Sequence, residues 1–171
     1  SQSKLGQALA AAGRGEEADQ AFEVYFKNDP DVGAVAIGGE HFRAGREEEA
    51  IKCFREILKK NPDNVDALRF LAAAYRKQDR NLSDAEALLR RVTLLEPDFT
   101  IGWIDLGRTL INRMNKVEAI KAYEQATIVS PKNSHAWVSL ASANAGAGYP
   151  EEAAKAYRKA IELNPNVPGS H

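Results

Sequence analysis

The sequence lacks most of the features that mark a chemical or membrane-bound function. Cys53 is its single cysteine, which excludes an internal disulfide and a cysteine-only zinc cage. Three widely separated histidines offer no metal-ligand spacing. Lys and Arg total 23 and Asp and Glu total 24, so the net charge of -1 provides no single-sign field to attract nucleic acid or anionic membrane. We therefore expect no metal, no cofactor, no nucleic acid and no membrane partner.

Long apolar runs and targeting signals are also absent. The N-terminal segment has a lysine and an Ala-x-Ala, but Gly6 and Gln7 interrupt its short apolar stretch. The longest charge-free stretch, 133–150, contains too many polar residues to partition into hydrocarbon. These observations predict a soluble, cytoplasmic protein.

The chain is rich in alanine, and its residue pattern repeats at a nearly constant interval. Alanine occurs 28 times beside 12 Gly and 7 Pro, which favours closely packed helices over strands. Three residue columns recur about every 34 residues. The first column consists of prolines. The second consists of alanines twelve residues before each proline, and the third of bulky apolar residues eight residues before each proline. The columns are Pro30, Pro62, Pro97, Pro131 and Pro165; Ala18, Ala50, Ala85, Ala119 and Ala153; and Phe22, Phe54, Leu89, Tyr123 and Tyr157. A fixed period of this length indicates a solenoid of stacked repeats.

Each repeat reads as two helices separated by a short breaker. In the last repeat, residues 136–147 show apolar residues at helical spacing and residues 150–163 form a second block led by Pro150. The residue before each column proline is pushed out of the α region, which ends the second helix. Ser83 and Glu86 have the spacing of a capping box at the start of one second helix.

These columns resemble the tetratricopeptide repeat, whose Trp-x2-Leu-Gly-x2-Tyr, Ala-x3-Phe and Pro positions can be read directly in the chain. The fourth repeat matches the pattern well, with Trp103, Leu106, Gly107, Leu110, Ala119, Tyr123, Ala126 and Pro131. One departure is Met114, which stands where glycine usually joins the two helices. We expect the neighbouring Asn115 to adopt the left-handed conformation in its place.

The resemblance implies an all-α, right-handed superhelical α-solenoid of about five helix-turn-helix units in a single array. The expected units are residues 1–30, 31–64, 65–99, 100–133 and 134–167, and residues 168–171 would start a truncated sixth. Both ends then fall inside repeats, so we hypothesise that the chain is a fragment of a longer protein. The last helix would offer Ala153, Ala156, Tyr157 and Ala160 on an uncovered face, which would promote self-association.

No constellation of residues predicts catalysis. Cys53 lies beside Phe54 with no histidine expected within reach, and His41 occupies a column where an interior, hydrogen-bonded role is favoured. The acidic clusters 16–17, 47–49 and 151–152 start second helices, where the helix dipole favours negative charge. We therefore expect a non-enzymatic protein.

Proteins of this family hold a peptide or protein segment in a concave groove lined by the first helix of each unit. Positions matching the family's groove give a lining that is partly apolar and partly basic, and it would suit an acidic or apolar segment. The expected groove residues are Val35, Phe42, Arg69, Arg76, Ile101, Ile104, Arg108, Ile111, His135, Val138 and Ser142. The carboxylate clamp of the chaperone-binding subgroup is not reproduced, which disfavours a chaperone-tail adaptor.

Three functions follow from the resemblance. The first is an interaction scaffold that binds a protein or peptide partner in the groove. The second is an accessory, substrate-recruiting array of a larger enzyme, because bacterial proteins that join such repeats to a C-terminal sulfotransferase domain look similar in their repeat junctions. The third is a self-associating structural array. The partner's identity cannot be read from the sequence, since the fold itself implies no ligand.

Overall fold

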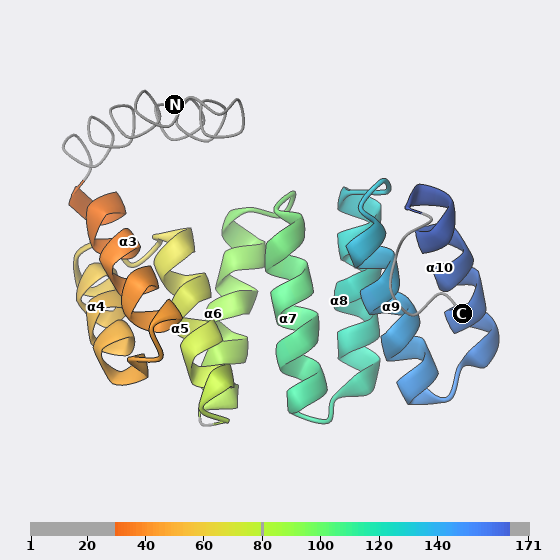
Figure 1. The fold of residues 1–171 in the computed structure, drawn as a ribbon, viewed down its shortest axis with the longest axis horizontal. Helices are drawn as coiled ribbons and strands as arrows, with labels where there is room; N and C mark the ends of the chain where they lie inside the picture. The colour runs from red at the N-terminus through yellow and green to blue at the C-terminus, as the bar shows by residue number, and fades with distance from the viewer. Residues whose placement is uncertain (1–29, 80, 165–171) are drawn as a thin grey trace. The chain divides into compact units, whose positions relative to one another are not determined.

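The computed structural model describes residues 30–79 and 81–164, and the described residues form eight α-helices. The helices are α3 Pro30–Arg43, α4 Glu47–Lys60, α5 Val65–Lys77, α6 Leu82–Leu95, α7 Thr100–Asn112, α8 Lys116–Val129, α9 Ser134–Ala147 and α10 Pro150–Leu163 (Figure 1). The predicted pairing of helices across short breakers is confirmed for this part of the chain. Residues 1–29 of the expected first repeat, with Ala18 and Phe22, and the expected start of a sixth at residues 168–171 lie outside the described residues.

The chain divides into two compact parts, residues 1–67 and 68–171. In the first part, α3 and α4 pack against each other. The apolar face of α4 buries Ala50, Ile51, Phe54 and Ile57. Gly38 of α3 makes this close approach possible, because a Cβ there would lie 2.6 Å from Cε1 of Phe54.

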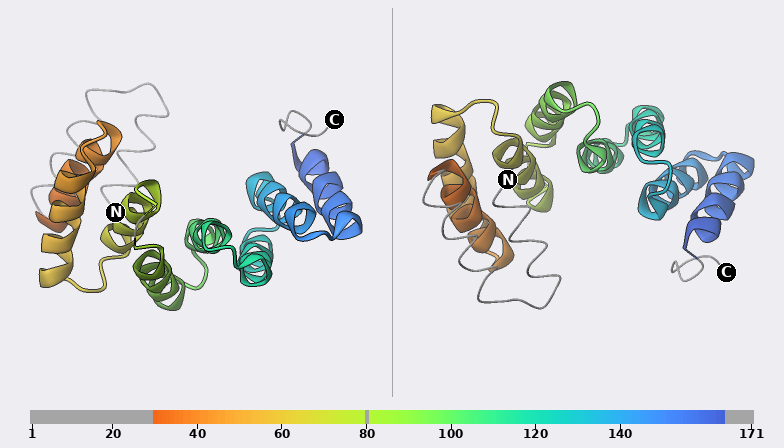
Figure 2. Two further views of the ribbon diagram at one scale, coloured as in Figure 1. Left: turned by 90° about the horizontal axis from the view of Figure 1, so that it is seen from below. Right: turned by 90° about the horizontal axis from the view of Figure 1, so that it is seen from above.

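The second part begins at Leu68, within α5. In this part, each helix from α6 to α10 packs against the next, and α7 also contacts α9. Figure 2 looks nearly along α6, α7 and α8 and shows α7 between its two neighbours. The column alanines Ala85, Ala119 and Ala153 are at most 4% exposed, so each lies in the core between packed helices. This layered packing is why the alanine column keeps its register.

The tryptophan and proline columns are joined by a hydrogen bond that repeats in the fourth and fifth units. Nε1 of Trp103 donates to the carbonyl oxygen of Pro97 at 2.8 Å, and Nε1 of Trp137 donates to that of Pro131 at the same distance. Each tryptophan therefore fixes the junction through which the chain enters its repeat. It satisfies a carbonyl of the turn that follows the preceding helix.

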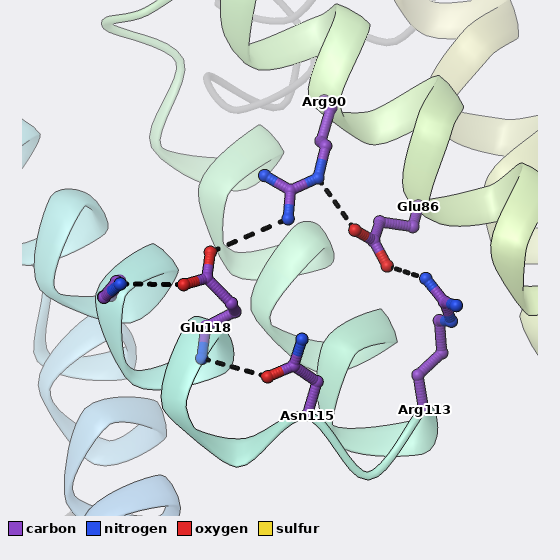
Figure 3. Close-up of polar contacts among 6 residues, drawn as sticks. Glu86, Arg90, Arg113, Asn115 and Glu118 are labelled. Atoms are coloured by element: carbon purple, nitrogen blue, oxygen red, sulfur yellow. Dashed lines mark hydrogen bonds and ion pairs between the residues drawn. The ribbon is translucent and has the colours of Figure 1, made fainter.

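A network of ion pairs connects the third repeat to the fourth (Figure 3). It joins α6, the second helix of the third repeat, to α8, the second helix of the fourth, and to the turn before α8. Glu86 of α6 pairs with Arg113 in the turn before α8 and with Arg90 at 2.8 Å, and Arg90 reaches Glu118 of α8 at 3.7 Å. Burial raises the pKa of Glu86, but the hydrogen bonds from Arg90 and Arg113 outweigh it and hold that pKa below its ordinary value. The carboxylate is therefore stabilised in its charged form.

Two local predictions are wrong. Ser83 and Glu86 form no capping box: α6 begins at Leu82 after Asn81, which makes no side-chain cap, and Glu86 is used by the two arginines instead. Met114 itself adopts the left-handed conformation, at φ 61°, and Asn115 does not. Asn115 is the N-cap of α8, where its side-chain oxygen accepts the N–H of Glu118, and this role requires an ordinary φ.

The expected uncovered alanine face on α10 is also corrected. Ala153, Ala156 and Ala160 are 1–4% exposed. They lie on the buried face of α10, which packs against α9, and Tyr157 of the same helix is partly exposed. Self-association stays a prediction without this feature to support it.

Candidate functional site

The first helix of the fourth repeat, α7, carries four of the predicted lining residues. Ile101 is 47% exposed, Ile111 is partly exposed, and the side chain of Arg108 is 45% exposed. Ile104 is only 5% exposed, so it belongs to the core and offers little surface to a partner. Positions 101, 105, 108 and 111 recur at helical spacing, which gives α7 one face with an apolar residue at each end and charges between them.

Asp105 lies at the centre of these charges and brings together the three predicted arginines. One carboxylate oxygen of Asp105 lies 3.4 Å from Nη1 of Arg108 and 3.8 Å from Nη1 of Arg76, and the other lies 3.7 Å from Nε of Arg69. Arg69 and Arg76 come from α5, so the cluster joins α5 to α7 within the second part. We call Arg69, Arg76, Arg108 and Asp105 the arginine cluster.

The cluster is largely shielded from solvent. The side chains of Asp105, Arg76 and Arg69 are 13%, 16% and 18% exposed. Burial lowers the pKa of Arg76, Asp105 acts against that shift, and Arg108 adds to it through like-charge repulsion. The guanidinium of Arg69 stacks over the rings of Phe70 and Phe99, with 4.9 and 5.5 Å between its central carbon and the ring centroids. Asp105, Arg69 and Arg76 are therefore held in place by packing.

The predicted lining residues of α9 lie on the helix next to α7. Val138 is partly exposed, and His135 and Ser142 are exposed. The hydroxyl of Ser142 lies 3.1 Å from that of Tyr157 on α10, within hydrogen-bonding distance. Since α7 contacts α9, the two helices present Ile111 and Val138 on adjoining elements. We call the exposed and partly exposed residues Ile101, Arg108, Ile111, His135, Val138 and Ser142 the α7/α9 face.

Val35 and Phe42 belong to α3 in the first part of the chain, where both are partly exposed. The structure thus brings together the three arginines and places the remaining second-part residues on two contacting helices. Asp105 is the residue whose role the sequence prediction missed. Its i,i+3 spacing from Arg108 was a readable signal, but its contacts with Arg69 and Arg76 depend on how α5 packs on α7.

Cys53 and His41 lie on the two helices of the first part. They line one hollow of about 460 Å³ between α3 and α4, together with Ile37 and Ile57. The Nε of Arg46 donates to Nδ1 of His41 at 2.9 Å, and both His41 and Cys53 are partly exposed.

The described residues contain no group of three or more His, Cys, Asp or Glu side chains placed to bind a metal ion. Within 30–79 and 81–164, no helix combines the length and apolar character needed to cross a bilayer.

Comparisons with known proteins agree with this architecture. Two family models, both described as tetratricopeptide repeat, match residues 41–112 and 104–168. A comparison with curated protein sequences found no match. The chain belongs to the tetratricopeptide repeat family, and its fold is an all-α solenoid of helix-turn-helix repeats.

Solved structures with the same fold are similar over nearly the whole chain. A crystal structure of MamA is 23% identical, with 94% of both chains covered and a TM-score of 0.73. TTC0263, a thermophilic TPR protein of Thermus thermophilus, is 20% identical over 96% of this chain and 91% of its own, also at 0.73. MamA from Desulfovibrio magneticus RS-1 is 20% identical over 98% of this chain and 96% of its own, again at 0.73. These identities establish the shared fold.

Proposed function

We propose that this protein is an interaction scaffold that binds a peptide or protein segment on the α7/α9 face. The observation that carries the proposal is that three apolar residues, Ile101, Ile111 and Val138, are exposed or partly exposed on two contacting helices. The positive charges of Arg69 and Arg76 are held in place on the neighbouring α5. Apolar side chains supply binding energy when a partner covers them, and fixed charges orient that partner. Membership of a repeat family that functions through protein binding supports the same function.

The proposal fits a non-enzymatic role. The arginine cluster contains cations and a single carboxylate, and the described residues of the α7/α9 face include no nucleophile paired with a base. A role as an accessory array of a larger enzyme, including one with a sulfotransferase domain, stays a prediction from the sequence. The cytoplasmic location is also a prediction.

The test is to place a charge in the middle of the proposed surface. Val138→Asp should abolish capture of partner proteins from an extract of the source cells, because a carboxylate would be buried beneath the bound segment. The matched control is Val117→Asp, which introduces the same change at a 57% exposed position at the start of α8. Circular dichroism should show both variants folded. If V138D captures the same proteins as V117D, partners bind elsewhere and the proposal is wrong.

A further inference from the structure

The arginine cluster contains more positive charge than its one carboxylate can balance. Three guanidinium groups lie within 4 Å of Asp105, so two positive charges are left without a counter-charge among the cluster residues. Like charges this close repel one another, and shielding from solvent strengthens the repulsion. A site of this kind gains free energy when an additional anion enters it.

The contacts within the cluster are longer than close charge-assisted hydrogen bonds. The distances of 3.4 to 3.8 Å compare with about 2.7–2.9 Å for a close charge-assisted hydrogen bond. Nη1 of Arg76 is buried and has no hydrogen-bond partner among the described residues. A buried donor without a partner is costly. Arg108, whose side chain is 45% exposed, is the arginine of the cluster that solvent reaches most.

The donors are positioned before any partner arrives. Arg69 is held over two aromatic rings, and Arg76 is confined by burial. An anion would therefore bind without the entropy cost of ordering these two long side chains. The exposed Arg108 is the member that must adjust.

From these observations we propose that Arg76 and Arg108 bind the side-chain carboxylate of an Asp or Glu residue in the partner segment. A carboxylate is planar and matches the fork of a guanidinium. Ile101 and Ile111 flank the cluster along α7, so the fitting segment carries aliphatic residues on both sides of its acidic one. The inference rests on the proposed function and specifies the chemistry of its ligand.

The experiment selects binders from a library of random 12-residue peptides displayed with a capped C-terminus, using the full chain. Selected peptides should share an Asp or Glu between aliphatic residues. The Glu form of a selected peptide should bind about tenfold more tightly than its Gln form, measured by fluorescence anisotropy. Arg108→Gln should remove that difference. Arg158→Gln, the same change at an exposed position of α10, should preserve it.

Other outcomes overturn the inference in distinguishable ways. Peptides that lose binding to V138D but carry no acidic residue would overturn the carboxylate site and leave the proposed function intact. The Glu and Gln forms of a selected peptide could bind equally, while a phosphoserine form binds the wild-type protein more tightly than R108Q. That result would overturn the carboxylate site and assign the cluster to phosphate. If no selected peptide depends on Val138, both the inference and the proposed function fail.

Discussion

At the scale of single residues, Met114 carries an identifiable backbone strain. It occupies the turn column in which two other repeats have Gly45 and Gly148, both with positive φ, and its own φ is 61°. A side chain with a Cβ is disfavoured in this conformation, and at 79% exposure Met114 gains little from packing. The strain is therefore not offset by burial.

We expect Met114→Gly to raise the free energy of unfolding by about 0.5–1 kcal/mol, because glycine adopts a positive φ without steric cost. Urea denaturation followed by circular dichroism measures the change. Met114→Ala serves as the control, since it removes the same side chain but keeps the Cβ. Equal stabilities of the glycine and alanine variants would show that the turn is not strained.

Gly107 illustrates the opposite use of glycine. A Cβ there would lie 2.6 Å from Cε1 of Tyr123, which is 6% exposed and cannot move aside. Gly107→Ala should therefore lower the free energy of unfolding by about 1–3 kcal/mol through overpacking. At Gly146 of α9 nothing lies within 4 Å of such a Cβ, so Gly146→Ala should stabilise the protein by up to about 1 kcal/mol. Thermal melts of the two variants should shift in opposite directions.

At the scale of helices, Glu86 makes the connection between α6 and the turn before α8 dependent on pH. Its pKa is lowered in the folded protein from an ordinary value of 4.5. The stabilisation is therefore present above that value and is lost as the pH falls through the folded pKa. Acid should weaken the junction between these repeats as Glu86 becomes protonated.

We expect Glu86→Gln to cost about 1 kcal/mol at pH 7, because the ion pairs with Arg90 and Arg113 lose their charge. The difference from the wild-type protein should shrink as the pH falls from about 6 to about 3. Denaturant unfolding at several pH values measures it. Glu124→Gln on the exposed side of α8 is the charge-matched control, and it should show no such trend. A constant difference at every pH would contradict the assignment.

The sequence predicted elements far better than it predicted contacts between them. The helix pairs follow from periodicity and column spacing, which depend only on neighbours along the chain. Which residue takes the positive φ in the turn at Met114, and whether Glu86 caps a helix or pairs with Arg113, depend on competing local and inter-helix partners. The sequence predicted Arg69, Arg76 and Arg108 as groove-lining residues but not their contacts with Asp105. The position of Asp105 among them depends on α5 packing on α7, which no sequence spacing specifies.

At the scale of the molecule, the packing is sequential. Among the described helices, α10 contacts only α9, whereas α7 contacts α6, α8 and α9. Stability in such an array is close to a sum of repeat stabilities and nearest-neighbour terms, so the effect of a defect depends on its place in the array. A defect in the last helix pair should remain local.

Ala160→Asp tests this expectation. Ala160 is 1% exposed on the face that α10 packs against α9, so an unpaired carboxylate there should cost several kcal/mol and detach α10. Native-state hydrogen exchange should then show loss of protection for amides of α9 and α10, while those of α7 and α8 remain close to wild-type protection. Gly107→Ala, in the middle of the second part, should instead reduce protection in α6, α7 and α8 together. A uniform loss in A160D would mean that the second part unfolds as one indivisible core, and the nearest-neighbour description would be wrong.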